Sequence, residues 1–142
     1  MVQYQAEFKP EGDVIVVTFP DVGYGATQGT TEAEALEMAT DFLVMAIGDL
    51  IKQGKQLPPA SSRRGRKYRW IKLPALAGVK TELYRELKDS RMRKAELARR
   101  LGISRGNMDR LFDLHHSTRL ELLEAAFAAL GRRLSIGVEK AA

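Results

Sequence analysis

The sequence predicts an α+β protein in which a β-β-β-α-β unit is followed by a set of helices. Apolar and polar residues alternate near the N-terminus, and a later segment repeats its apolar residues every three or four positions. After Pro74 the pattern changes to that of several short helices. We therefore expect two domains in this chain of 142 residues, one over residues 1–73 and an all-α one over residues 74–142.

Three strands are predicted within the first 30 residues. The stretch Val2–Phe8 alternates as in a strand with one buried face. A turn at 11–13 leads to Val14–Phe19, a β-branched apolar run that predicts a more buried partner strand. A third short strand is expected around Ala26–Gln28, among glycines that permit tight backbone paths.

One long helix and a fourth strand complete the first half. Thr31 and Glu34 have the spacing of a capping box, in which each side chain satisfies a free amide of the first turn. The helix is expected to run to about Gln53 and to stop at Gly54, with one broad apolar face on the sheet. The alternation in Tyr68–Leu73 then predicts a strand.

Charge is distributed unevenly along the chain, whose formal net charge is +5. Residues 1–58 hold nine acidic and three basic side chains, a net of −6, whereas residues 59–142 have a net of +11. A basic half suits a polyanion, so we expect different partners for the two halves. The basic loop at 63–67 could touch nucleic acid, but a solvated loop is the favoured interpretation. Its basic residues are Arg63, Arg64, Arg66 and Lys67.

The most specific pattern covers Lys94–Leu111 and predicts two short helices with helix-turn-helix spacing. Ala98 is small where the helices would cross. Gly102 is placed where the chain must turn, and a left-handed conformation is expected there. Ser104 follows as the predicted N-cap of the second helix.

The second of these helices carries polar side chains in its first two turns, from where they reach base edges in the major groove. The predicted base-reading residues are Ser104, Arg105, Asn107, Asp109 and Arg110. Nearby cations suit phosphates, which add affinity without sequence choice. The predicted phosphate-binding residues are Arg93, Lys94, Arg99 and Arg100.

The same pattern has an alternative interpretation, an ordinary helical hairpin with a solvated charged face. Asp109 in particular could pair with Arg105 or Arg110 instead of facing a base.

A last helix and a short strand are predicted at the C-terminal end. Ser117 or Thr118 is the expected cap of a helix over Leu120–Leu130. The alternation of apolar residues in 134–138 predicts a short C-terminal strand. An edge strand needs a mate, and a symmetric dimer would supply one.

Composition argues against several function classes. The chain has no cysteine and only two histidines, adjacent at 115 and 116, so thiolate chemistry, a metal site and a cofactor are not expected. The carboxylates of a nuclease would have to converge on Mg²⁺, and Asp13, Asp21, Asp41 and Asp49 follow no such motif. We expect no enzyme activity. No apolar run approaches the roughly 18 residues of a membrane span, so we expect a cytoplasmic protein without a membrane partner.

Several segments together resemble the HicB antitoxins of bacterial toxin-antitoxin pairs. In the first half these are Phe19–Asp21 and Thr27–Ala35, which look like the family's strand-to-helix signature. In the second half, Glu96–Gly102 and Arg110–Thr118 are similar to the family branch that ends in a helix-turn-helix. One departure is Gly23–Gly25, where the family commonly has a proline-glycine turn.

The resemblance implies a partial RNase H-like N-terminal domain that is not itself a nuclease. It implies that this domain covers a small RNA-cleaving HicA toxin, while the C-terminal domain represses the operon by binding operator DNA. Independently of the resemblance, a homodimer or higher homo-oligomer is expected, because two recognition helices about one helical turn apart read a palindrome. In the acidic N-terminal domain, the candidate toxin-binding residues are Asp21 and Tyr24. The alternative function is a free-standing helix-turn-helix repressor whose N-terminal domain senses a small molecule.

Overall fold

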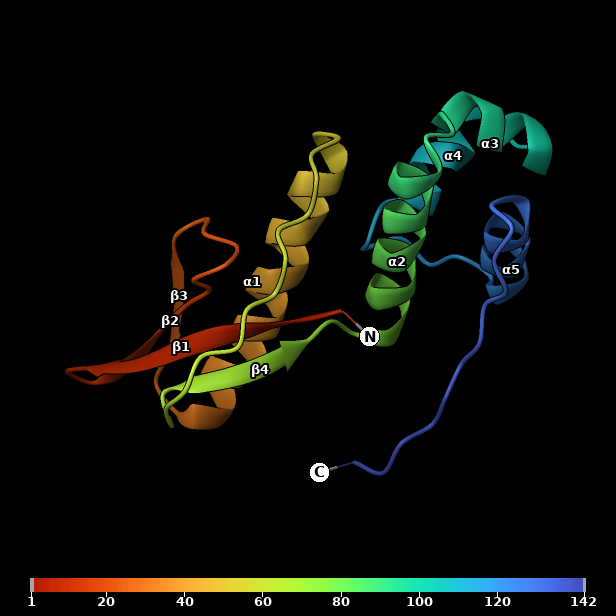
Figure 1. Cartoon of the computed structure of the whole chain (residues 1–142). Helices are drawn as coiled ribbons and strands as arrows, with labels where there is room; N and C mark the ends of the chain where they lie inside the picture. Colours follow the sequence, from red (N-terminus) through yellow and green to blue (C-terminus); the bar gives the residue numbers. More distant parts are fainter. Residues whose placement is uncertain (1, 142) are drawn as a thin grey trace.

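The computed structural model describes residues 2–141 and has the predicted α+β architecture (Figure 1). The N-terminal elements are β1 (Gln3–Glu11), β2 (Val14–Thr18), β3 (Ala26–Gly29), α1 (Glu32–Lys52) and β4 (Tyr68–Lys72). The helices that follow are α2 (Ala75–Ser90), α3 (Lys94–Leu101), α4 (Arg105–Leu111) and α5 (Leu120–Ala129). The predicted β-β-β-α-β order is therefore confirmed, and helices follow it.

The four strands form one antiparallel sheet in the order β3-β2-β1-β4. Tyr4 and Ala6 are fully buried, as the alternation in β1 predicts, and α1 covers one face of the sheet (Figure 1). Gln5 between them is also buried, contrary to the expectation of one buried face, because its side chain is hydrogen-bonded to the backbone of Arg63. Gly29 lies where β3 meets the first turn of α1. A Cβ atom there would stand 2.4 Å from the backbone nitrogen of Ala35, so this close approach requires glycine.

Local signals set both ends of α1 as expected. The Thr31 hydroxyl accepts a hydrogen bond from the Glu34 amide at 3.1 Å. The Glu34 carboxylate in turn accepts from the Thr30 amide at 3.2 Å, one residue earlier than in the expected capping box. The helix ends at Lys52, and Gly54 adopts a φ of +70° just beyond it.

The buried side chains continue from the sheet into the helical part. α2 begins three residues after the end of β4 and packs against both α1 and α5. The predicted boundary at 73 and 74 falls in this short link, and the apolar core runs across it. The division into two domains stays a prediction, as does the RNase H-like description of the first one.

The single chain departs from two expectations for the C-terminal end. Residues 132–141 form no strand, and Ile136 and Val138 are 58% and 100% exposed (Figure 1). An ion pair of 2.7 Å joins Glu139 to Lys72 of β4, but the backbone of this segment does not pair with that strand. The last helix is capped by Arg119, without a side-chain hydrogen bond, and not by Ser117 or Thr118. The chain stays irregular over 117–119, so the helix begins beyond the two hydroxyl residues.

Within residues 2–141, no helix combines the length and the apolar character that crossing a bilayer requires.

Candidate nucleic-acid interface

α3 and α4 are joined by a three-residue turn whose geometry follows from two residues. Gly102 has a φ of +65°, and its amide donates to the Arg99 carbonyl at 3.2 Å. Ser104 is the N-cap of α4, and its hydroxyl accepts from the Asn107 amide at 3.2 Å. Both predictions for this turn are confirmed.

α4 is amphipathic despite its seven residues. Met108 and Leu111 are buried in the core beside Leu97 of α3. The polar residues of the helix all lie outside this buried stripe and are exposed. They are Arg105, Asn107, Asp109 and Arg110. The structure therefore places four of the five predicted base-reading side chains in solvent, whereas the Ser104 hydroxyl is engaged as the cap.

Two of these exposed residues contact each other. The Arg110 Nη1 donates to the Asn107 Oδ1 at 3.1 Å, so a single turn of α4 offers a guanidinium oriented by an amide. Among residues 2–141 no ion pair joins Asp109 to Arg105 or Arg110, although the sequence suggested one.

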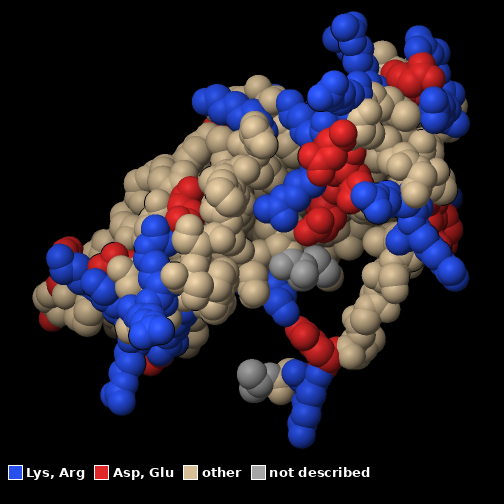
Figure 2. Space-filling model, viewed as in Figure 1, with Lys and Arg blue, Asp and Glu red and all other residues tan. Residues whose placement is uncertain are grey.

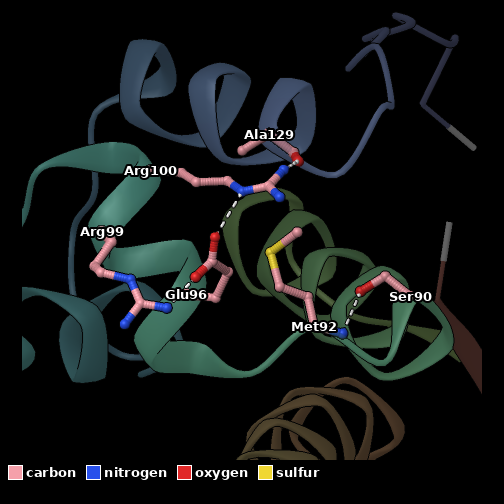
Figure 3. Close-up of polar contacts among 6 residues, drawn as sticks. All are labelled: Ser90, Met92, Glu96, Arg99, Arg100 and Ala129. Carbon is pink, nitrogen blue, oxygen red and sulfur yellow. Dashed lines mark hydrogen bonds and ion pairs between the residues drawn. The ribbon is translucent and has the colours of Figure 1, made fainter.

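The four predicted phosphate-binding residues fall into two groups. Arg93 is exposed immediately before α3, and the Lys94 ammonium lies 5.1 Å from the centre of the Phe112 ring. Arg99 and Arg100 both pair with Glu96, and Arg100 also donates to the Ala129 carbonyl at the end of α5 at 3.3 Å (Figure 3). Their two charges are therefore partly balanced within the protein.

The Glu96 carboxylate is a fixed negative charge in this interface. Hydrogen bonds from Arg99 and then from Arg100 hold the pKa of Glu96 below its usual value. Glu96 is consequently ionised at neutral pH. It orients both guanidinium groups and also reduces the positive potential around them.

In the folded molecule, residues 1–58 do not form the separate acidic surface that their net charge of −6 suggested. Basic side chains gather around α3 and α4, and a second basic group lies at the other end of the molecule, at lower left in Figure 2. Residues 59–73 add six basic groups, so residues 1–73 are neutral overall and residues 74–142 have a net charge of +5. Three ion pairs join basic residues of 59–73 to acidic residues of 1–58. They are Arg63–Asp21, Lys67–Glu7 and Arg69–Glu32.

The candidate toxin-binding residue Asp21 is engaged within the protein. Its carboxylate accepts from the Ser61 amide at 2.6 Å and from the Arg63 guanidinium at 3.0 Å, and its side chain is only 9% exposed. The Arg63 hydrogen bond keeps the pKa of Asp21 below its ordinary range. The Gln5 side chain donates to the Arg63 carbonyl and accepts from its amide, so the basic loop is anchored at this point.

The other candidate, Tyr24, is presented to solvent. It is 42% exposed and has a φ of +70° between two glycines that also have positive φ values. Its hydroxyl donates to the Asp49 Oδ2 of α1 at 2.8 Å, and this carboxylate raises the pKa of Tyr24. Tyr24 therefore stands on the surface beside α1, while Asp21 does not.

Sequence reasoning missed Lys80, which is fully buried in α2. Its ammonium donates to the carbonyls of Arg110, Asp113 and His116 at 2.9, 2.8 and 2.6 Å. One signal was present: Lys80 interrupts the apolar stripe of its helix, four residues after Leu76. A lysine in such a stripe must either extend to solvent or find buried acceptors.

Residues suited to metal binding are dispersed. Within residues 2–141 no three of the histidine, aspartate and glutamate side chains are grouped so as to hold an ion. His115 and His116 are exposed after α4. The absence of catalysis stays a prediction.

Comparison with known proteins gives consistent similarities over nearly the full length. Residues 3–82 match the family described as HicB-like antitoxin of bacterial toxin-antitoxin system. Antitoxin HicB of Pseudomonas fluorescens (strain Pf0-1) is 33% identical, over 99% of this chain and 97% of the relative. Antitoxin HicB of Escherichia coli (strain K12) is 36% identical, over 89% of this chain and 91% of the relative.

Among solved structures, a toxin-antitoxin complex from Streptococcus pneumoniae matches with 36% identity and a TM-score of 0.41, over 43% of this chain and 45% of that one. The match of the family model over more than half of the chain agrees with the full-length relatives. This protein therefore belongs to the HicB-like antitoxin family of bacterial toxin-antitoxin systems.

Proposed function

We propose that this protein neutralises an RNA-cleaving toxin of the HicA type through residues 1–73 and represses its own operon by reading operator DNA with α4. The observation that carries the DNA-binding part is the exposed polar surface of α4, to which Arg105, Asn107 and Arg110 belong, while Met108 and Leu111 are buried. A major groove about 12 Å wide admits one helix, and these side chains match the donors and acceptors of guanine and adenine.

Phosphate contacts would come from the basic residues around α3. Arg93 and Lys94 precede or open this helix, and Arg99 and Arg100 close it. A helix that crosses the DNA backbone while the next one enters the groove is the usual arrangement of a helix-turn-helix protein. The net positive charge of the chain lies in residues 74–142, which supports this assignment.

Toxin binding is assigned to the first half because the family is one of antitoxins. Asp21 is an anchor of the basic loop, so we assign contact with the toxin to the surface around Tyr24, at the start of β3 and beside α1. An exposed tyrosine with a defined hydroxyl partner is typical of residues that contribute strongly to protein interfaces.

A second copy of the chain is proposed to complete the DNA-binding form. Apolar residues alternate along the extended C-terminal segment, and Ile136 and Val138 are exposed in the single chain (Figure 1). Pairing with the same segment of a second copy would cover them and satisfy the strand edge. Two copies of α4 would then face successive major grooves.

A gel-shift assay with the DNA upstream of the operon tests the DNA-binding part. Wild-type protein should retard this DNA at low salt, and Arg105→Ala should weaken the binding by about 5- to 150-fold, the cost of one bidentate base contact. Arg64→Ala is the matched control, because Arg64 is also an exposed arginine but lies in the basic loop, outside α3 and α4. No retardation at low salt would overturn the proposal.

Co-purification tests the toxin-binding part. The protein encoded by the neighbouring reading frame is expressed together with this chain. The two proteins should purify as a complex, and the toxin in this complex should no longer cleave RNA. Arg105→Ala should leave this complex intact, whereas Tyr24→Ala should weaken it. If Arg105→Ala abolished both activities, unfolding would explain the loss better than a missing base contact.

A further inference from the structure

Lys80 holds the carboxyl end of α4. Its side chain is fully buried, and the Nζ atom lies within hydrogen-bond distance of three backbone carbonyls, those of Arg110, Asp113 and His116. Each of the three ammonium protons thus has one acceptor. The carbonyls come from the last turn of α4 and from the turn that follows it, 30 to 36 residues further along the chain.

The last four carbonyls of a helix have no amide donor within that helix, and water usually donates hydrogen bonds to them. Here a buried cation replaces the water. Because the helix dipole places partial negative charge at this end, a lysine ammonium also interacts favourably with it. The Arg110 and Asp113 carbonyls each accept a backbone amide as well, from Asp113 at 3.2 Å and from His116 at 3.1 Å. Loss of the ammonium would therefore remove one donor from each of three carbonyls in a site closed to solvent.

A second contact joins the same helices. The rings of Tyr84 in α2 and Phe112, just after α4, meet edge to face with centroids 6.2 Å apart. The amino end of α4 is fixed by the Ser104 cap. α4 is therefore fixed at both ends, and α2 provides the fixed point at the carboxyl end.

We propose that Lys80 is a positioning residue for DNA recognition, which keeps the exposed side of α4 in one orientation and so sets the affinity for operator DNA. It contacts no DNA itself, because its ammonium is enclosed. This inference rests on the proposed DNA-binding function, but its structural part can be tested without DNA.

The test compares Lys80→Met with Lys88→Met in the full-length protein. Lys88 is in the same helix, and its ammonium also donates to a backbone carbonyl, that of Gly54 at 2.6 Å, after α1. Hydrogen exchange of the backbone amides is measured for both variants, together with the affinity for upstream DNA at several salt concentrations.

For Lys80→Met we expect exchange of the amides of residues 108–116 to accelerate at least about tenfold, with the amides of β1 unchanged. DNA affinity should fall by a similar factor while its salt dependence keeps the wild-type slope, because no phosphate contact is removed. Lys88→Met should behave as wild type in both measurements.

The inference is overturned if Lys80→Met exchanges and binds like Lys88→Met. It is also overturned if acceleration spreads evenly over the sheet, which would indicate general destabilisation. If no form binds DNA but 108–116 exchange faster in Lys80→Met, the proposed DNA-binding function fails while the structural role stands. Should Lys80→Met not fold, NMR of the wild-type lysine ammonium groups decides: the Lys80 protons should exchange more slowly than those of Lys88, and equal rates contradict the enclosed contact.

Discussion

The Asp21 carboxylate and the Arg63 guanidinium lie 3.0 Å apart across 42 residues of sequence. This contact ties the turn after β2 to the basic loop that precedes β4. Because the Asp21 side chain is 9% exposed and the Arg63 side chain 33% exposed, it is better shielded than most ion pairs of this protein. It accounts for the loop having a defined path although its composition is that of a flexible segment.

Asp21→Asn should lower the free energy of unfolding at neutral pH. It should also make this free energy less dependent on pH in the acid range. The folded pKa of Asp21 lies below its ordinary value of 3.8, so folding favours the ionised form. The resulting stability is complete above pH 3.8 and is lost as the pH falls through the folded pKa. Urea unfolding of both forms at pH 7 and near pH 3 measures this, and the advantage of the wild type should narrow at the lower pH. A constant difference would show that Asp21 acts by packing alone.

Glu96→Gln should tighten DNA binding. Glu96 pairs with Arg99 and Arg100 (Figure 3), and removal of its charge would leave both positive charges unbalanced by a carboxylate, although Arg100 keeps its hydrogen bond to the Ala129 carbonyl. Affinity for upstream DNA should rise, with a steeper dependence on salt concentration. Glu124→Gln, an exposed change in α5, is the control for the loss of one negative charge. Weaker binding of Glu96→Gln would mean that Glu96 chiefly orients the two arginines.

Ser104→Ala should cost about 1 kcal/mol of unfolding free energy, the usual value of an N-cap. The Ser104 hydroxyl accepts the Asn107 amide, and alanine cannot replace it. Denaturant unfolding monitored by circular dichroism is a suitable measurement. Ser62→Ala in the exposed loop provides the comparison and should leave the midpoint unchanged. Equal midpoints for the two variants would contradict the role of the cap.

Features that depend on neighbouring residues could be predicted from the sequence. The Thr31 cap, the left-handed Gly102 and the Ser104 cap each involve contacts within about four residues, and the structure has all three. The strands followed in the same way from alternation over a few residues. Such patterns are set by local backbone geometry, which the sequence displays directly.

Features that depend on distant residues could not be predicted. Lys80 finds acceptors 30 or more residues away, and Asp21 finds Arg63, so neither contact leaves a local pattern. The acidic character of residues 1–58 was misleading for the same reason, because folding brings the basic residues of 59–73 onto that half. The C-terminal strand needs a mate that a single chain does not provide.

Two glycine-to-alanine changes should have opposite effects on stability. Gly29→Ala would place a Cβ atom 2.4 Å from the Ala35 backbone nitrogen, which neither β3 nor α1 can avoid without moving, so a loss of about 1–3 kcal/mol is expected. Gly106 lies in α4 with open space around it, and alanine there should add about 0.5–1 kcal/mol by restricting the unfolded chain. Thermal unfolding of the two variants and the wild type measures both changes in stability. A Gly29→Ala protein as stable as the wild type would contradict the close approach of β3 to α1.

Val138→Asp should disrupt the proposed dimer and thereby weaken DNA binding. Val138 is fully exposed in the single chain, so an aspartate there costs little in the monomer, but pairing of two segments would bury the charge. Sedimentation equilibrium should detect a shift toward monomer, and the gel shift should show a corresponding loss of affinity. Lys140→Asp is the control, because it introduces the same residue beyond the alternating apolar positions of the segment. If Val138→Asp sediments like the wild type and binds DNA equally well, the two copies meet through another surface.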